Sequence, residues 1–127
     1  MSTGDGLTFS EAFPVFVVAD LDRALGFYCR LLGAVETFRF PPDGDAAYVS
    51  LALGEGKLGL GIDPSTAARA NAALELCVYA SDCDDAVEHL RRAGVTIVDE
   101  PADQVWGERL ARVEDPDGNR ITLLSRL

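Results

Sequence analysis

Two short apolar segments open two similar halves of the chain. Residues 13–18 are rich in Phe and Val, and residues 74–79 are apolar in the same way. Each segment has the length and composition of a buried strand. Each is followed by apolar positions at helical spacing: Leu21, Ala24, Leu25, Tyr28 and Leu32 in the first half, and Cys83, Ala86, Val87 and Leu90 in the second. The pattern therefore predicts that each strand leads into an amphipathic helix.

Polar and glycine residues mark the ends of both predicted helices. Asp20 precedes the first helix, where its carboxylate is placed to accept hydrogen bonds from the free amides of the first turn. Ser81 or Asp82 is placed to cap the second helix in the same way. Gly33 and Gly94 follow the last helical residues, and glycine takes a left-handed conformation there without a Cβ penalty.

Three further strands are expected after each helix. In the first half they cover residues 35–40, 47–53 and 57–62, and in the second half residues 95–99, 107–114 and 120–124. Gly54, Glu55 and Gly56 form the last turn of the first half. The corresponding turn of the second half is Asp-Pro-Asp-Gly-Asn at 115–119, a strong hairpin signal because proline fixes φ and glycine tolerates positive φ.

The two halves also share residues, which indicates an internal repeat. Residues 18–25 align with residues 80–87, so that Asp20 matches Asp82 and Ala24 matches Ala86. The predicted order is βαβββ twice, in modules covering about 13–62 and 74–125, with residues 63–73 as a linker. Because neither module closes a core alone, we expect one α+β domain over 1–127. In it the tandem modules form a curved mixed sheet around a pocket, with the helices on the outer face.

Composition narrows the classes of partner. The formal net charge of −10 disfavours binding to nucleic acid or to an anionic membrane, whereas it would attract a cationic ligand. No run reaches the roughly 20 apolar residues that cross a bilayer, and the first residues show no export signal. The three cysteines have no metal-type spacing. We therefore expect a cytoplasmic protein with reduced, mostly buried thiols.

Three stretches resemble the glyoxalase/bleomycin resistance protein/dioxygenase (vicinal oxygen chelate) superfamily, in its bleomycin-resistance-like branch. Residues 17–28 are similar to the opening strand and helix of that superfamily. Residues 82–95 repeat the feature, and Trp106-Gly107 followed by the 115–119 turn resembles the C-terminal signature of the branch. Together with the duplicated order of elements, the resemblance covers almost all of the chain from residue 13 onward.

The resemblance implies a concave sheet that lines a pocket. Members commonly form homodimers in which modules from both chains complete each pocket, so a homodimer is expected here. The superfamily contains metal-dependent lyases, isomerases and dioxygenases, thiol transferases acting on fosfomycin, and metal-free proteins that sequester bleomycin-type drugs. A shared fold does not choose among these functions.

The metal positions that the resemblance implies are poorly filled in this sequence. The first-strand position falls on Phe13, whose ring cannot ligate, and the last-strand position falls on Thr122, a poor ligand. Glu75 is the only plausible metal ligand among these positions. The single histidine, His89, is expected on the solvent face of the second helix. We therefore predict no metal, no other cofactor and no catalytic residue.

Six residues are candidates for ligand binding. Alternation along the strand places Glu108, Leu110 and Arg112 on one face together with Trp106, and the resemblance suggests that this face lines the pocket. Trp106 is interpreted either as a stacking wall for a planar or cationic ligand or as a core or dimer-contact residue. Glu75 on a neighbouring strand needs a partner, which is either Arg112 in a structural ion pair or a bound cation. Phe13 adds aromatic surface, whereas the inward face of Phe38, Phe40 and Tyr48 stays open.

The sequence therefore favours a metal-independent small-molecule binding protein that sequesters an antibiotic or a cationic aromatic metabolite. A divalent-metal-dependent lyase, isomerase or dioxygenase of the glyoxalase type is the alternative. A regulatory or structural dimer with a vestigial pocket is a third hypothesis.

Overall fold

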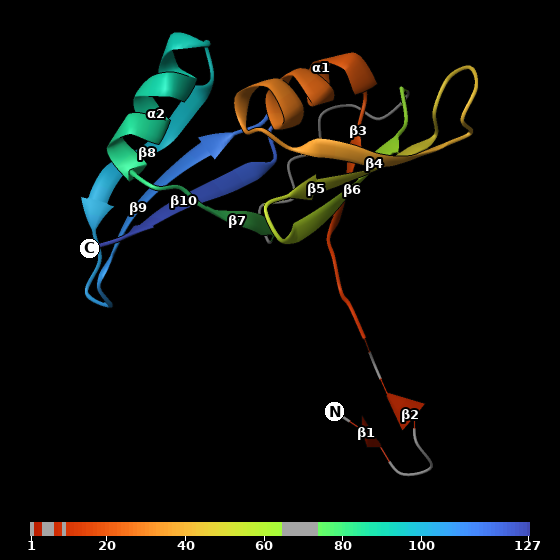
Figure 1. Ribbon diagram of the computed structural model, residues 1–127. Coiled ribbons are helices and arrows are strands. Elements are labelled where there is room, and N and C mark those ends of the chain that lie inside the picture. The colour runs from red at the N-terminus through yellow and green to blue at the C-terminus, as the bar shows by residue number, and fades with distance from the viewer. Residues whose placement is uncertain (1, 4–6, 9, 65–73) are drawn as a thin grey trace.

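The strands of the two modules form two separate four-stranded sheets (Figure 1). The computed structural model describes residues 2–3, 7–8, 10–64 and 74–127, so most of the expected linker lies outside the described residues. The first sheet has the order β3-β6-β5-β4 and the second the order β7-β10-β9-β8. In each sheet the first strand of the module is an edge strand that pairs in parallel with the last strand of that module, β3 with β6 and β7 with β10. The predicted α+β class with tandem βαβββ modules is confirmed.

The strand boundaries follow the sequence pattern closely. The first sheet contains β3 (Val15–Val18), β4 (Val35–Phe40), β5 (Tyr48–Leu53) and β6 (Gly56–Ile62). The second contains β7 (Glu75–Tyr79), β8 (Thr96–Asp103), β9 (Glu108–Glu114) and β10 (Arg120–Arg126). β8 runs past the predicted end at Asp99 and includes Pro101. It is an edge strand of the second sheet, where a proline is tolerated because one side of the strand needs no ladder hydrogen bond.

The helices lie on one face of the sheets (Figure 1). In the first module, α1 (Leu21–Leu25) continues directly into a π-helix, η1 (Gly26–Leu31), in which the amide of Leu32 donates to the carbonyl of Phe27. The second module has a regular helix, α2 (Cys83–Arg92). The part of the chain that the structure describes contains no helix that is both long and apolar enough to cross a membrane.

The predicted caps are present. The amide of Arg23 donates to the Asp20 carboxylate at 3.0 Å, and Asp82 rather than Ser81 caps α2, accepting from the amide of Asp85 at 2.9 Å. Gly33 has a φ of 85° and Gly94 has a φ of 84°, as expected for residues that end helices.

The two modules share a core, and the 115–119 turn of the second module contacts the helical segment of the first. Buried side chains of both modules, among them Phe16, Tyr28, Val87 and Ile121, form one apolar cluster. The buried carboxylate of Asp115 accepts a hydrogen bond from the Tyr28 hydroxyl at 2.6 Å. The 115–119 turn is thus a contact between modules as well as a hairpin turn.

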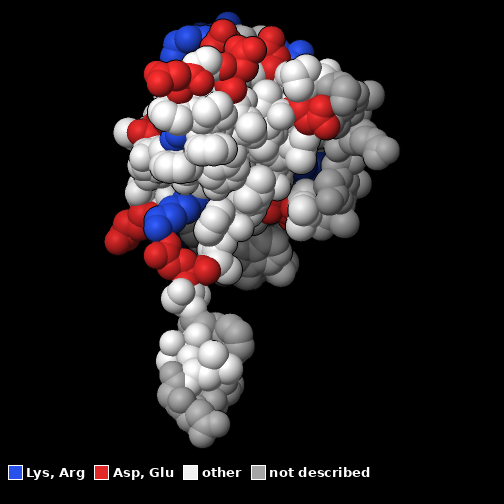
Figure 2. Space-filling view, turned by 90° about the vertical axis from the view of Figure 1, so that its right-hand side faces the viewer, with Lys and Arg blue, Asp and Glu red and all other residues white. Residues whose placement is uncertain are grey.

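A short hairpin near the N-terminus stands apart from this body. β1 (Ser2–Thr3) pairs with β2 (Leu7–Thr8), and Figures 1 and 2 both show the hairpin away from the sheets. Figure 2 views the molecule from the side of the first module. Uncharged residues cover most of that side, while acidic and basic side chains gather at the level of the helices and, at the opposite end of the body, near the N-terminal hairpin.

Candidate functional site

The faces of the sheets that carry no helix are the candidate binding surfaces. Because side chains alternate along a strand, every second residue points away from the helices. On the second sheet this helix-free face is rich in charged residues, whereas on the first sheet it is apolar. The described residues therefore offer two chemically different surfaces within one chain.

An ion network centred on Arg112 crosses the second sheet. Arg112 lies on β9, and its Nε donates to Oε2 of Glu75 on β7 at 3.2 Å. Its Nη1 donates to Oδ2 of Asp99 on β8, also at 3.2 Å. The same Oε2 of Glu75 accepts a hydrogen bond from the Thr122 hydroxyl at 2.8 Å. All four strands of the sheet thus contribute a side chain to this network.

The contacts within this network favour the charged forms of Glu75 and Arg112. The hydrogen bond from Thr122, followed by the hydrogen bond and the charge of Arg112, lowers the pKa of Glu75. The hydrogen bond to Asp99 and the contact with Glu75 raise the pKa of the Arg112 guanidinium. Both side chains remain partly exposed, at 40% for Glu75 and 31% for Arg112, so a bound molecule has access to them.

A second cluster combines two exposed aromatic rings with one carboxylate. The indole Nε1 of Trp106 donates to Oε1 of Glu108 at 2.9 Å, and the Tyr79 hydroxyl donates to Oε2 of Glu108 at 2.5 Å. The guanidinium carbon of Arg126 lies 4.3 Å from the centre of the Tyr79 ring. Trp106 and Tyr79 are exposed at 59% and 51%, so Trp106 is not a core residue of the single chain.

Glu108 is held in its ionised form within this cluster. The hydrogen bonds from Tyr79 and Trp106 lower the pKa of its carboxyl group, with Tyr79 as the larger cause. The same hydrogen bond raises the pKa of the Tyr79 hydroxyl. A carboxylate flanked by two aromatic rings favours a positively charged group, and Arg126 already provides one.

The helix-free face of the first sheet is apolar and exposed. The exposed fractions of its large apolar side chains lie between 47% and 63% for Val15, Val17, Val35, Phe38 and Phe40, and Phe13, which precedes β3, is exposed at 48%. Tyr48 lies beside Phe38, with ring centres 6.4 Å apart, and covers Gly59 of β6. Phe38, Phe40 and Tyr48 thus share the face away from the helices, a point that the sequence pattern left open.

The structure brings the six sequence-predicted residues together only in part. Glu75 and Arg112 meet in the ion network, and Trp106 and Glu108 meet in the aromatic cluster. Leu110 lies between them on β9 but is buried at 7%, and Phe13 lies outside the second sheet, two residues before β3 of the first sheet. None of the six lines the cavity described below.

Three participants were missed by the sequence reasoning. Tyr79 alternates with Glu75 along β7, so the period of a strand could have identified it. Asp99 and Arg126 face their partners only through the strand register, which pairs Asp99 with Arg112 and Arg126 with Glu108. A register of this kind cannot be read from the pattern of a single strand.

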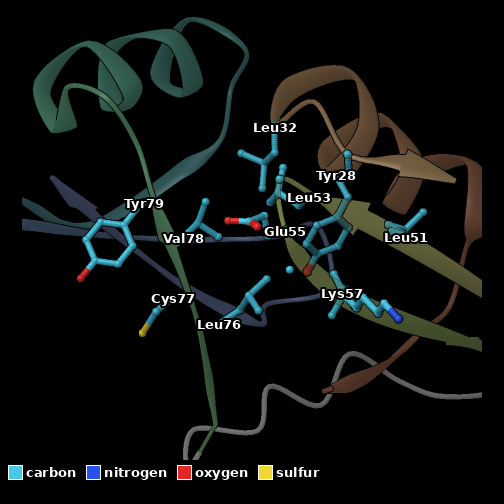
Figure 3. Close-up of a pocket in the computed structure, with 14 residues that line it drawn as sticks. Tyr28, Leu32, Leu51, Leu53, Glu55, Lys57, Leu76, Cys77, Val78 and Tyr79 are labelled. Atoms are coloured by element: carbon cyan, nitrogen blue, oxygen red, sulfur yellow. The ribbon is translucent and has the colours of Figure 1, made fainter. Parts of the chain in front are cut away.

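A cavity of about 470 Å³ lies at the junction of the two modules. Its walls come from the end of η1, from the β5–β6 hairpin and from β7, and are mostly apolar. In Figure 3, Leu32, Leu53 and Val78 point into this space, while the ammonium group of Lys57 points away from it. Lys57 instead forms an ion pair with Glu11. The cavity results from the packing of one module on the other, so no local sequence motif predicts it.

No three His, Cys, Asp or Glu side chains among the described residues are grouped closely enough to hold a metal ion. The described cysteines are all free thiols. Cys83 is buried and Cys29 half-buried, but Cys77 is exposed on β7, so the expectation of mostly buried thiols is wrong for Cys77. Burial is the largest cause that raises the pKa of each of the three thiols. This arrangement gives no sign of an activated nucleophile.

Comparison with known sequences identifies related proteins. The model of the family described as Glyoxalase/Bleomycin resistance protein/Dioxygenase superfamily matches residues 12–123. The Uncharacterized protein Rv0887c of Mycobacterium tuberculosis is 30% identical over 122 residues, covering 87% of this chain and 71% of that protein. The Uncharacterized protein Mb0911c of Mycobacterium bovis has the same identity, with 79% of its length covered.

Solved structures show the same fold. TioX from Micromonospora sp. ML1 is 26% identical with a TM-score of 0.74, covering 94% of this chain and 100% of that one. A bleomycin resistance determinant encoded on the transposon Tn5 is 25% identical with a TM-score of 0.70, covering 93% and 98%. TnmS3, an antibiotic binding protein from Streptomyces sp. CB03234, is 24% identical with a TM-score of 0.73, covering 95% and 99%. At that identity the likeness to TnmS3 is one of fold alone.

Proposed function

The chain belongs to the Glyoxalase/Bleomycin resistance protein/Dioxygenase superfamily, and from that premise we propose that it is a metal-independent protein that binds and sequesters an aromatic, positively charged small molecule. The observation that carries this proposal is the cluster that Tyr79 and Glu108, on the helix-free face of the second sheet, form with Trp106 of the β8–β9 turn. Two exposed rings and one ionised carboxylate form a surface that suits a planar cation.

The position of Arg126 supports a cationic ligand. Its guanidinium lies over the Tyr79 ring and is the cross-strand neighbour of Glu108, so a positive charge is already stabilised at this surface within the chain. A ligand cation would take the place of Arg126 over the same aromatic face. The net charge of −10 favours the approach of such a molecule over long distances.

Sequestration needs a tight pocket and no reacting groups. The bleomycin resistance determinant on Tn5, which is 25% identical to this chain, supports an antibiotic as the class of ligand. The alternative is a divalent-metal-dependent lyase, isomerase or dioxygenase, which the superfamily also contains. No group of described residues favours that alternative, because Glu75 is paired with Arg112 and Thr122.

We propose further that a second copy of the chain completes the pocket. The aromatic cluster lies on an open sheet face, and the apolar face of the first sheet exposes Val17, Phe38 and Phe40. Covering such apolar surface is favourable, at about 25 cal/mol for each Å² removed from water. A homodimer would provide both the cover and a second wall for the ligand.

Titration with ethidium, a planar aromatic cation, tests the proposed ligand class. Trp106 is the only tryptophan, so quenching of its fluorescence reports binding at this surface. We expect the wild type to bind ethidium and Trp106→Ala, measured by calorimetry, to bind at least about 10-fold more weakly because a stacking wall is lost. A 10-fold loss of affinity corresponds to about 1.4 kcal/mol of binding free energy.

Val105→Ala is the matched control, since Val105 is the fully exposed neighbour of Trp106 and has no role in the cluster. Its affinity for ethidium should equal that of the wild type. Unchanged affinity in Trp106→Ala would contradict the placement of the ligand on the indole ring.

A further inference from the structure

Arg112 lies between two carboxylates that come from opposite edges of the second sheet. Glu75 is on β7, one edge strand, and Asp99 is on β8, the other. The guanidinium reaches Oε2 of Glu75 through Nε and Oδ2 of Asp99 through Nη1, each at 3.2 Å. A single positive group therefore bridges the whole width of the sheet.

The surroundings hold this bridge in place. Thr122 on β10 is the cross-strand neighbour of Arg112 and is 2% exposed. Its hydroxyl donates a hydrogen bond to the same Oε2 of Glu75. Asp99 is the cross-strand neighbour of Arg112 on β8. The oxygen of Glu75 that faces the sheet thus already accepts two hydrogen bonds, from Arg112 and from Thr122.

These residues do not fit the divalent metal that the superfamily implies. Glu75 and Thr122 stand at two positions where its enzymes hold a metal, and here they are in contact with each other. Phe13, at a third position, has no side-chain atom that can bind a metal. The Thr122 hydroxyl already donates a hydrogen bond to Glu75. A metal ion at Glu75 would also lie beside a guanidinium, and like charges at that range repel.

We infer that Arg112 takes the place of the divalent cation on this face, where its guanidinium neutralises Glu75 and Asp99 and keeps a metal out. Arginine suits this role because it does not lose its proton in proteins, so no rise in pH within the range of a folded protein frees the carboxylates. The inference concerns only the chain's own charges and holds whatever ligand the aromatic cluster binds.

If Arg112 is what excludes the metal, its replacement by a ligating side chain should create a metal site. Arg112→His leaves an imidazole between two carboxylates, a donor set that binds Mn²⁺, Fe²⁺, Ni²⁺ or Zn²⁺. Arg120 provides a matched control on the same face. It is the cross-strand neighbour of Glu75, yet the described residues show no hydrogen bond between its guanidinium and a carboxylate.

Calorimetric titration of the full, untagged chain with MnCl₂ tests the inference, with circular dichroism to verify folding. We expect no binding in the wild type or in Arg120→His, and about one Mn²⁺ per chain in Arg112→His with at least 100-fold higher affinity. Adding Glu75→Gln to Arg112→His should lower that affinity at least 10-fold. Arg112→Asn, which supplies a neutral oxygen, should gain at least 10-fold over the wild type and serves if the histidine variant does not fold.

Three results would overturn the inference. The first is stoichiometric Mn²⁺ binding by the wild type. The second is a folded Arg112→His or Arg112→Asn chain that binds Mn²⁺ no better than the wild type. The third is a gained site that survives Glu75→Gln, because the metal would then lie elsewhere.

Discussion

At the scale of single residues, Asp115 shows how one buried carboxylate joins the two modules. It is 4% exposed, and its two oxygens accept from the amides of Asp117 and Asn119, from the Asn119 side chain and from the Tyr28 hydroxyl. The first three contacts shape the 115–119 turn, whereas the fourth ties that turn to η1. A buried charge is tolerated here because donors surround it.

Tyr28→Phe removes the contact between modules and leaves the turn intact. Because Asp115 keeps three donors, we expect a loss of about 1–2 kcal/mol in the free energy of unfolding at pH 7, measured by urea denaturation. Burial, followed by the charge and hydrogen bond of Asp115, raises the pKa of Tyr28 in the folded chain. Its stabilising contribution is therefore complete below about pH 10, where the unfolded tyrosine titrates, and is lost as the pH rises above that value.

The stability difference between the wild type and Tyr28→Phe should accordingly shrink by about 1.4 kcal/mol for each pH unit above 10. Urea denaturation of both proteins at pH 8, 10 and 11 measures this difference directly. A gap that stays constant over this range would contradict a neutral, buried Tyr28 hydroxyl as the donor to Asp115.

At the scale of elements, β6 carries two glycines with different surroundings. A Cβ at Gly59 would lie 2.5 Å from the Tyr48 hydroxyl oxygen and 2.9 Å from a methyl group of Val15. A Cβ at Gly61, two residues further on the same face, would meet no atom within 4 Å. The absence of a side chain at Gly59 is thus what lets Tyr48 lie across the strand.

Alanine at each of these positions separates the two cases. Both substitutions reduce the freedom of the unfolded chain, which stabilises by about 0.4–1 kcal/mol where the new side chain fits. We expect Gly61→Ala to be neutral or stabilising and Gly59→Ala to destabilise by about 1–3 kcal/mol, since Tyr48 must move. Urea midpoints of the two variants measure the effect, and equal midpoints would show that Tyr48 does not depend on Gly59.

Most elements were predictable because their signals are local. The cap at Asp20 and the strand at 35–40 follow from spacing and residue type alone, whereas the sequence left the second cap open between Ser81 and Asp82. The π-helix at 26–31 was not predicted, because its apolar residues have the spacing expected of an α-helix. The π-form adds one residue to a turn, and Phe27 and Tyr28 of that turn are both buried in the shared core.

The candidate site was predictable only where alternation within one strand sufficed. That rule placed Glu108 and Arg112 on one face and suggested the Glu75–Arg112 pair, which the structure contains. It could not supply Asp99 as the second carboxylate, because that contact depends on how β8 lies beside β9 with irregular register. The burial of Leu110 likewise depends on neighbouring strands that the pattern of β9 does not contain.

At the scale of the whole molecule, the two sheets present unlike faces on the side without helices. The second sheet carries its own compensating charges, with Arg112 set between Glu75 and Asp99. The first sheet has no such compensation, since Phe38 and Phe40 are more than half exposed. A contiguous apolar face of this kind is typical of a surface that another protein covers, which is the physical basis for the proposed homodimer.

Phe38→Asp tests whether this face is covered by a second copy. A carboxylate placed within an apolar interface would have to lose its hydration without a partner, so the dimer should weaken strongly. We expect light scattering coupled to size-exclusion chromatography at micromolar concentration to give a dimer mass for the wild type and a monomer mass for Phe38→Asp. The single chain should remain folded, because Phe38 is already exposed in it.

Arg92→Glu is the control for the added negative charge. Arg92 is exposed on α2, in the layer that covers the opposite face of the second sheet, so this variant changes the net charge by more than Phe38→Asp without touching the apolar face. It should keep the dimer mass. A monomeric wild type, or a Phe38→Asp chain that remains dimeric, would mean that the helix-free face of the first sheet is not where two copies meet.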